Sequence, residues 1–402
     1  MKSKVRTTAL TCLVLLLFSF VFFRYGGRSV SLHALTVGFL YAGDESTPYT
    51  YGFLRAQENL EEAYPREVKT YTQSNVPEEK VKEALLFLIK KGCTLIFTNS
   101  RSSLFQEVAA THPQVQFCQL SLKPYEGEKE PLENYHTFQA ETYQARYLSG
   151  IIAGFKLQDL VESRVITPVA ATLGFVACSP SAEDISAYTA FFLGVRHVMP
   201  KATMKVYYTG EHNNYFLEKA CTEKLIQEGC QVISQSTDSL GPAIACENSF
   251  SLRKAYFIGY NQPLQKLAPA SCLSSIAPDY TPYIQGAARA LLAGESIEKM
   301  VAGNLHPGND LSASFSEGWL SLLDVNFALL PYAVQRNINQ TLGSLHKNPG
   351  LVFSGNYLGV SPWDENDTWD LNTPYEENKN SSSPTFHYVL KDVIKTEDFE
   401  MP

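Results

Sequence analysis

Residues 231–261, QVISQSTDSLGPAIACENSFSLRKAYFIGYN, indicate the fold class more clearly than any other stretch. The pattern predicts a strand around Val232 and Ile233, a short helix opened by Pro242, and a second strand in KAYFIGY. Two strands joined by a helix within so few residues form a βαβ unit, in which the strands run parallel with a right-handed crossover. The segment therefore predicts an α/β protein built on parallel sheets.

Polar side chains follow both strands of this unit. Thr237 and Asp238 follow the first strand, and Tyr260 and Asn261 end the second. Parallel sheets bind ligands beyond the carboxyl ends of their strands. These residues predict part of a pocket for a small polar molecule.

The same alternation of strand and helix extends over most of the chain. It begins at Leu35, with a first strand that ends near Asp44 and a third that ends at Asn99 and Ser100, and a second block starts at Thr172. Two blocks built on one plan predict two lobes with a cleft between them. The pattern weakens after about residue 306.

The last quarter of the chain gives weaker signals. We predict one strand within 311–323, a helix opened by Pro331, an irregular segment over 361–385, and a short helix near Tyr388–Ile394.

Composition limits the classes of function. The chain has 402 residues, of which 45% are apolar and 18% charged, so it can form the cores of two domains. The net charge of −8 and the absence of a basic cluster beyond the N-terminus argue against nucleic-acid binding. The 22 tyrosines supply rings that can both stack and hydrogen-bond.

The N-terminus has the pattern of an export signal. Lys2, Lys4 and Arg6 precede a mostly apolar run from Ala9 to Phe23. The run suits either a removed signal peptide or an uncleaved membrane anchor, and both alternatives stay open. Either way, we expect the rest of the chain outside the cytoplasm.

Metal, disulfide and catalytic signatures are missing from the sequence. Seven cysteines follow Cys12 without a CxxC pair, and Cys93, Cys118 and Cys178 lie in apolar strands, where we predict buried thiols. Neither a phosphate-binding glycine loop nor a GxSxG or SxxK motif occurs. We therefore expect no cofactor, no metal and no enzymatic activity.

Five segments have a characteristic order and spacing. They are VGFLYAGDESTPYTYGFLRAQENLE (37–61), ETYQARYLSGIIAG (141–154), AYTAFFLGVRHVMPKATMKVYYTG (187–210), EKLIQEGCQVISQSTDS (223–239) and AYFIGYNQPLQKLAPASCLSSI (255–276). Through these segments, the sequence from Val37 to about Phe353 resembles the basic membrane protein family of solute-binding proteins, which are extracytoplasmic receptors of ABC importers and include purine nucleoside receptors.

The resemblance implies a type I periplasmic-binding-protein fold with three crossovers between its lobes, a purine base or nucleoside as ligand, and an ABC permease as partner. Two positions depart from the family. Asn261 stands where members usually carry Asp, and Pro278 and Tyr280 replace an aromatic pair. An amide bonds hydroxyl groups without charge assistance. Three alternatives for the ligand therefore stay open: the chain binds a free base, it binds a different nucleoside, or it has lost ligand binding.

We expect lobe 1 to comprise 34–137 and 262–309, lobe 2 to comprise 138–261 and 310–356, and the tail to begin at 357. We also expect a monomer.

The expected ligand site combines an aromatic ring for stacking with polar strand ends. Asp44 and Asp279 also suit the start of the following helix, where a side-chain oxygen accepts backbone N–H groups. The predicted ligand-binding residues are Asp44, Tyr49, Asn99, Ser100, Thr237, Asp238, Tyr260, Asn261, Asp279 and Tyr280.

Two other functions are alternatives to ligand delivery. A membrane-anchored sensor or regulator of the same fold would bind ligand without delivering it. A nucleoside hydrolase would need a carboxylate cluster such as DxDxxxDD, which the sequence lacks.

Overall fold

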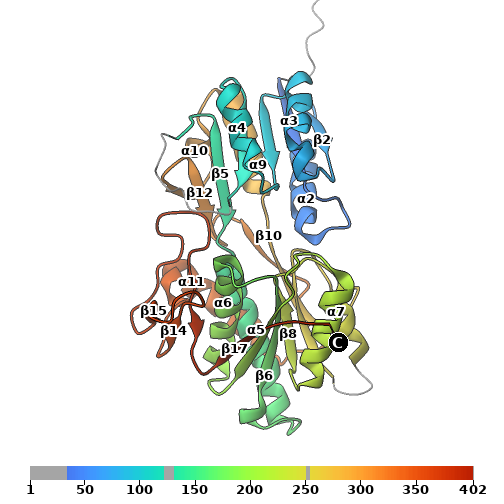
Figure 1. Cartoon of the computed structure of the whole chain (residues 1–402), viewed down its shortest axis with the longest axis vertical. Helices are drawn as coiled ribbons and strands as arrows, with labels where there is room; N and C mark the ends of the chain where they lie inside the picture. The colour runs from blue at the N-terminus through green and yellow to red at the C-terminus, as the bar shows by residue number, and fades with distance from the viewer. Residues whose placement is uncertain (1–33, 122–130, 250–253, 402) are drawn as a thin grey trace, which may run out of the picture.

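The computed structural model describes residues 34–121, 131–249 and 254–401, and these form two lobes (Figure 1). Each lobe is built on a seven-stranded sheet, and a three-stranded sheet lies beside the second lobe. The predicted signal or anchor, 1–33, lies outside the described residues. Among the described helices, none combines the length and the hydropathy that a membrane crossing needs.

The first sheet has the strand order β11-β12-β5-β4-β3-β1-β2, and its described strands are parallel except at the β11–β12 pair. The strands are β1 (Leu35–Leu40), β2 (Val68–Gln73), β3 (Leu95–Thr98), β4 (Gln116–Leu120), β5 (Tyr135–Ala140), β11 (Asn304–His306) and β12 (Asp310–Ala313). The helices of this lobe are α2 (Pro48–Ala63), α3 (Val81–Lys90), α4 (Leu104–Thr111), α9 (Thr281–Ala293) and α10 (Ile297–Met300).

Helices cover both faces of this sheet, which explains its continuous apolar strands. Val37 and Phe39 of β1 share a core with Phe53 of α2 and Tyr283 of α9. Leu40, on the opposite face, packs in the core formed with α3 and α4.

The second sheet has the order β13-β10-β9-β8-β6-β7-β17, with β13 as the one antiparallel neighbour among the described strands. The strands are β6 (Thr172–Ala177), β7 (Thr203–Tyr208), β8 (Val232–Gln235), β9 (Tyr256–Tyr260), β10 (Cys272–Pro278), β13 (Leu320–Leu323) and β17 (Ile394–Asp398). The helices are α5 (Thr142–Glu162), α6 (Ala182–Val198), α7 (Tyr215–Gln227), α8 (Gly241–Asn248) and α11 (Ala333–Lys347).

The predicted βαβ unit is confirmed. Strand β8 leads through α8 to β9, and the two strands pair in parallel from Val232 opposite Tyr256 to Ser234 opposite Ile258.

All seven cysteines of the described residues are free and buried, as expected for the three strand cysteines.

The chain passes between the lobes three times in the described residues. It leaves β5 for α5 at Glu141, it leaves β10 for α9 between Pro278 and Thr281, and it leaves β12 for β13 after Ala313. This arrangement confirms the predicted two-lobed fold with three crossovers.

The late segments differ from the sequence prediction. Strand β10, expected in lobe 1, belongs to the second sheet, and β12, expected in lobe 2, belongs to the first. The predicted single strand at 311–323 is two strands in different sheets. The turn between them holds Gly318 at φ +78, and Glu317 accepts a hydrogen bond from the Ser314 amide at 3.0 Å.

The C-terminal segment also differs, because it forms strands and is anchored in the second lobe. Strands β14 (Leu358–Val360), β15 (Thr368–Asp370) and β16 (Val389–Leu390) form the small sheet. In place of the predicted final helix, β16 and β17 follow one another, and β17 extends the second sheet by pairing with β7. Leu371, Phe386 and Leu390 are fully buried in the core of that lobe.

Helices α5 and α6 approach so closely that only glycine fits at their contact. A Cβ atom at Gly150 would lie 2.0 Å from the Phe191 carbonyl oxygen, and one at Gly194 would lie 2.1 Å from the Tyr147 carbonyl oxygen. This contact fixes α6, whose N-terminal turn points toward the first lobe (Figure 1).

We expect Gly150→Ala to lower the free energy of unfolding by about 1–3 kcal/mol, because the added methyl group forces the two backbones apart. Gly343→Ala is the matched control. Its Cβ would meet nothing within 4 Å at this exposed position of α11, so alanine should stabilise by roughly 0.5–1 kcal/mol. Urea unfolding monitored by circular dichroism measures both; equal effects of the two substitutions would contradict the packing argument.

Candidate functional site

A cavity of about 410 Å³ lies where the carboxyl ends of the strands in the two sheets face each other. That volume is within the range of small-molecule sites. Both lobes line it, through the ends of β1, β3, β4 and β5 on one side and of β8 and β9 on the other. The N-terminal turns of α2 and α6 complete the lining.

Seven of the ten residues predicted from the sequence line this cavity, and the structure brings them together from both lobes and from the second crossing. They are Tyr49, Asn99, Ser100, Asp238, Tyr260, Asn261 and Tyr280.

The other three predicted residues lie outside the lining and have other partners. Asp44 accepts hydrogen bonds from Ser46 and from Asn75 at 2.7 Å, and these bonds lower its pKa to about 2. Thr237 points away from the cavity and donates to Glu218 at 2.7 Å. Asp279 accepts the Thr281 amide hydrogen at 2.9 Å, the helix-start role that its position also allowed.

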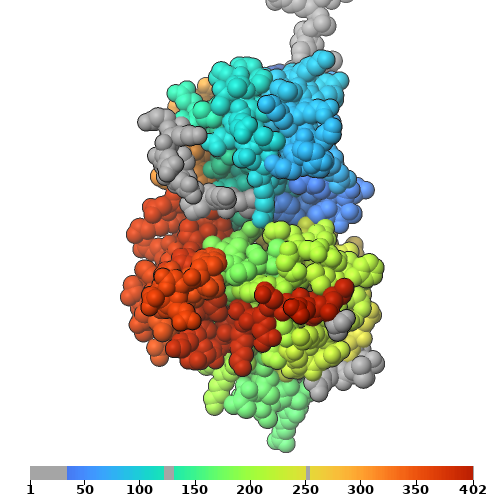
Figure 2. Space-filling view, in the orientation of Figure 1, coloured from blue at the N-terminus to red at the C-terminus, as the bar shows by residue number. Residues whose placement is uncertain are grey.

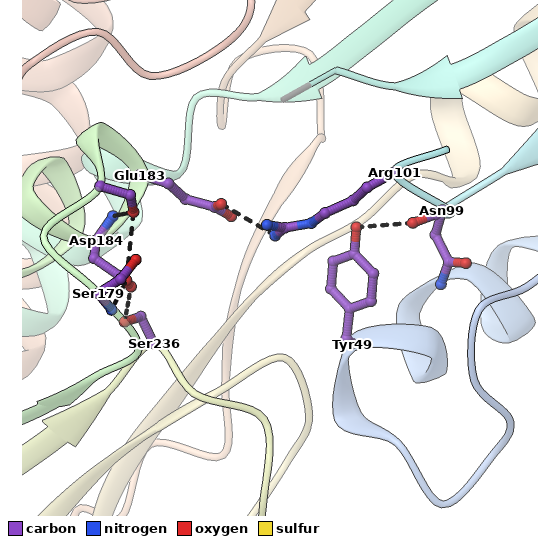
Figure 3. A network of polar contacts seen from close by, with 8 residues as sticks. Tyr49, Asn99, Arg101, Ser179, Glu183, Asp184 and Ser236 are labelled. Atoms are coloured by element: carbon purple, nitrogen blue, oxygen red, sulfur yellow. Dashed lines mark hydrogen bonds and ion pairs between the residues drawn. The ribbon is translucent and has the colours of Figure 1, made fainter. Parts of the chain in front are cut away.

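Three tyrosine rings face the cavity. The Tyr49 hydroxyl donates to the Asn99 carbonyl oxygen at 3.1 Å, and burial raises the pKa of Tyr49, so the phenol stays neutral (Figure 3). Tyr280 packs on Phe53 with ring centroids 4.5 Å apart. Tyr260 lies 3.7 Å from the buried Arg146 guanidinium, a cation–π contact that fixes the ring.

Asp238 keeps spare hydrogen-bonding capacity in the cavity. Its carboxyl group accepts a hydrogen bond from the Asn261 side-chain amide at 3.4 Å, a long contact. Burial raises the pKa of Asp238 to about 7, opposed by hydrogen bonds from Asn261 and from the Tyr49 backbone of the facing lobe.

The backbone explains why Asn261 suits its position. Its φ is +67, in the left-handed region that asparagine and aspartate occupy more readily than other side-chain-bearing residues. The backbone N–H of Asn261 donates to the Ile276 carbonyl oxygen at 2.9 Å, which connects this turn to β10. The side chain is thereby held beside Asp238.

Sequence reasoning missed an ion pair that joins the lobes across the cavity. Arg101, after β3, reaches Glu183 at the start of α6 with a nitrogen–oxygen distance of 3.1 Å (Figure 3). The side chains are 44% and 38% exposed, so the pair contributes roughly 0.2–1 kcal/mol. No pattern in the sequence points to this pair, since the two residues belong to different lobes.

Asp184 and Gln139 were missed as well. Asp184 is buried and accepts hydrogen bonds from Ser236 and from the Ser179 amide at 3.0 Å, while burial raises its pKa. The sequence Ser181-Ala-Glu-Asp184 is a capping signal that could have placed this acid at a helix start. Gln139, at the end of β5, is 5% exposed, and its Oε1 has no hydrogen-bond partner among the described residues.

The sequence model of one protein family, ABC transporter substrate-binding protein PnrA-like, matches residues 36–303. The chain belongs to that family. It is therefore a solute-binding protein of the ABC transporter type, which confirms the family resemblance and the expectation that it is not an enzyme. Proteins of this family typically lie outside the cytoplasm.

Individual relatives agree with this assignment. A purine-binding protein of Brucella abortus is 27% identical over 276 residues, which cover 68% of this chain and 73% of the relative. A solute-binding protein of an ABC transporter system from Conexibacter woesei has a TM-score of 0.57 at 16% identity, covering 79% of this chain and 97% of that one.

A transcriptional activator of the comK gene from Bacillus halodurans has the same fold. Its TM-score is 0.60 at 19% identity, and the similarity covers 78% of this chain and 98% of that structure.

Proposed function

We propose that this cavity binds a purine base or nucleoside and that the chain delivers it to an ABC permease from outside the cytoplasm. The observation that carries the proposal is the half-buried Asp238, with spare hydrogen-bonding capacity, among three tyrosine rings. Flat heterocycles stack on such rings at roughly 1–3 kcal/mol per base. The purine-binding relative in Brucella abortus supports the same ligand class.

The charge of the lining favours a base or nucleoside over a nucleotide. Glu78, Glu183, Asp184 and Asp238 contribute carboxyl groups to the cavity, whereas Arg101 is the one Lys or Arg side chain in its described lining. Arg101 is already paired with Glu183. A phosphate group would meet uncompensated like charge, and like charges in contact disfavour binding by several kcal/mol.

The polar groups that remain suit a ligand rich in N–H and O–H donors. Asp238 offers a carboxylate, and the amides of Asn261 and Gln139 can both accept and donate. Closure of the lobes about the three crossings would bury the ligand between the two sets of strand ends, as in other hinge-type proteins.

The alternative is a sensor of the same fold that binds ligand without delivering it. The apolar run from Ala9 to Phe23, suited to an uncleaved anchor, favours it, and the fold is shared with a protein named as a transcriptional activator. Uptake of labelled purine into cells that carry or lack this chain separates the two functions, because a sensor leaves uptake unchanged.

Calorimetric titration with adenine, hypoxanthine, adenosine and inosine tests the ligand class. We expect at least one of them to bind with a Kd of about 1 µM or tighter, near −8 kcal/mol. Adenosine monophosphate is the control for the charge argument, and it should bind at least ~100-fold more weakly than adenosine. Absence of binding by all four compounds would refute the purine assignment.

Asp238→Ala should weaken purine binding by about 10–100-fold, since a hydrogen bond to a charged group contributes roughly 1.5–3 kcal/mol. Asp44→Ala is the matched control, because Asp44 is an acid of the facing lobe that does not line the cavity. Its affinity should stay within about twofold of wild type. Unchanged affinity in Asp238→Ala would remove that residue from the site.

The affinity for purine should also weaken as the pH is lowered. Ligand donors need the ionised carboxyl group, and with a pKa of about 7 Asp238 is mostly protonated at about pH 6 and mostly ionised at about pH 8. We expect the Kd to be about tenfold higher at about pH 6 than at about pH 8. In Asp238→Asn, which cannot ionise, the dependence should vanish; a wild-type profile in that variant would assign the titration to another group.

A further inference from the structure

Residues 377–386, which we call the strap, lie beyond the region matched by the family. Both ends contact the second lobe, because Ser186 of α6 donates to Glu377 at 3.4 Å and Phe386 packs in the core of that lobe. At its start, the Glu377 carboxylate accepts the amide hydrogens of Thr385 at 2.7 Å and Phe386 at 2.8 Å. Phe386 itself is fully buried and stacks on Phe353 with centroids 4.1 Å apart. The strap is thus a loop closed on itself at the surface of the second lobe.

The middle of the strap reaches the first lobe. The Ser382 amide and hydroxyl donate to the two oxygens of Asp310 in β12, at 2.6 and 2.5 Å. The hydroxyl groups of Ser383 and Ser121, which follows β4, lie 2.7 Å apart. Figure 1 shows the C-terminal chain reaching the boundary between the lobes near β12, and Figure 2 shows C-terminal residues covering that boundary on one side.

These contacts are buried. Asp310 is 2% exposed, and Ser382 and Ser383 are fully buried. Charge-assisted hydrogen bonds shielded from water are about twice as strong as neutral ones, whereas exposed ion pairs such as Arg101–Glu183 contribute little. The side of the molecule near the crossings therefore holds the lobes together more firmly than the ion pair across the cavity.

We propose that the strap is a fourth, non-covalent connection between the lobes, which restrains their opening. The three covalent crossings allow rotation, but separation of the lobes pulls Asp310 and Ser121 away from a loop that belongs to the second lobe. Opening must therefore break the contacts of Ser382 and Ser383 or strain the strap. The inference concerns the motion of the lobes and does not depend on which ligand binds.

A disulfide between the strap and the first lobe tests this restraint. In Ser121→Cys/Ser383→Cys the two sulfur atoms replace hydroxyl oxygens 2.7 Å apart, close enough for a disulfide after a small adjustment. Dyes attached to non-natural residues at exposed Leu86 and Phe216, one in each lobe, report the open population by energy transfer without any ligand.

We expect oxidation of this variant to lower the ratio of open to closed molecules at least tenfold, and reduction to restore the wild-type ratio. The single variants Ser121→Cys and Ser383→Cys should not respond to oxidation. Releasing the strap with Ser381→Ala/Ser382→Ala/Ser383→Ala should raise the same ratio several-fold, whereas Ser344→Ala on exposed α11 should leave it unchanged.

An unchanged open population in the oxidised variant, with the disulfide verified by mass, would overturn the proposal, because the lobes would then open without moving the strap. An unchanged population in the triple alanine variant would overturn it as well. Neither outcome bears on purine binding, which is measured separately.

Discussion

Parallel pairing places the carboxyl ends of all parallel strands at one edge of each sheet, and the arrangement of the cavity depends on this constraint. Residues far apart in the sequence, such as Asn99, Gln139, Asp238 and Asn261, lie around one space because each lies at or just after the carboxyl end of a parallel strand. The three crossings then keep the two edges opposite each other. A site made this way has one half on each lobe, so binding and lobe closure are coupled.

Asp184 and Asp238, two acids that line the cavity from the second lobe, differ in what surrounds them. Asp184 accepts hydrogen bonds from Ser236 and from the Ser179 amide, so it is largely satisfied by the protein. Asp238 accepts one long hydrogen bond, from the Asn261 side chain. An incompletely paired carboxyl group withdrawn from water costs free energy, and a ligand that donates to it offsets that cost. This difference supports the proposal that Asp238 contacts the ligand while Asp184 stabilises the fold.

The period of apolar residues was enough to predict the sheets and the cavity edge. The finer errors concern single side chains in the turns that follow the strands. Asp238 lines the cavity, whereas its neighbour Thr237 bonds Glu218. Arg101 and Glu183 could not be paired from the sequence, since only the assembled lobes bring them together. Sequence therefore located the strand ends but not the direction of each side chain.

The C-terminal strands illustrate the other limit. β14, β15 and β16 have two or three residues each, too few for a periodic pattern, and the burial of Ser381, Ser382 and Ser383 depends on Asp310, about seventy positions earlier. A ligand can enter only if the open form is populated, so the contacts that favour closure can differ from those that favour opening by only a few kcal/mol. An ion pair across the cavity adds little to that balance. Buried bonds near the crossings can therefore determine how often the lobes separate, although their residues do not line the cavity.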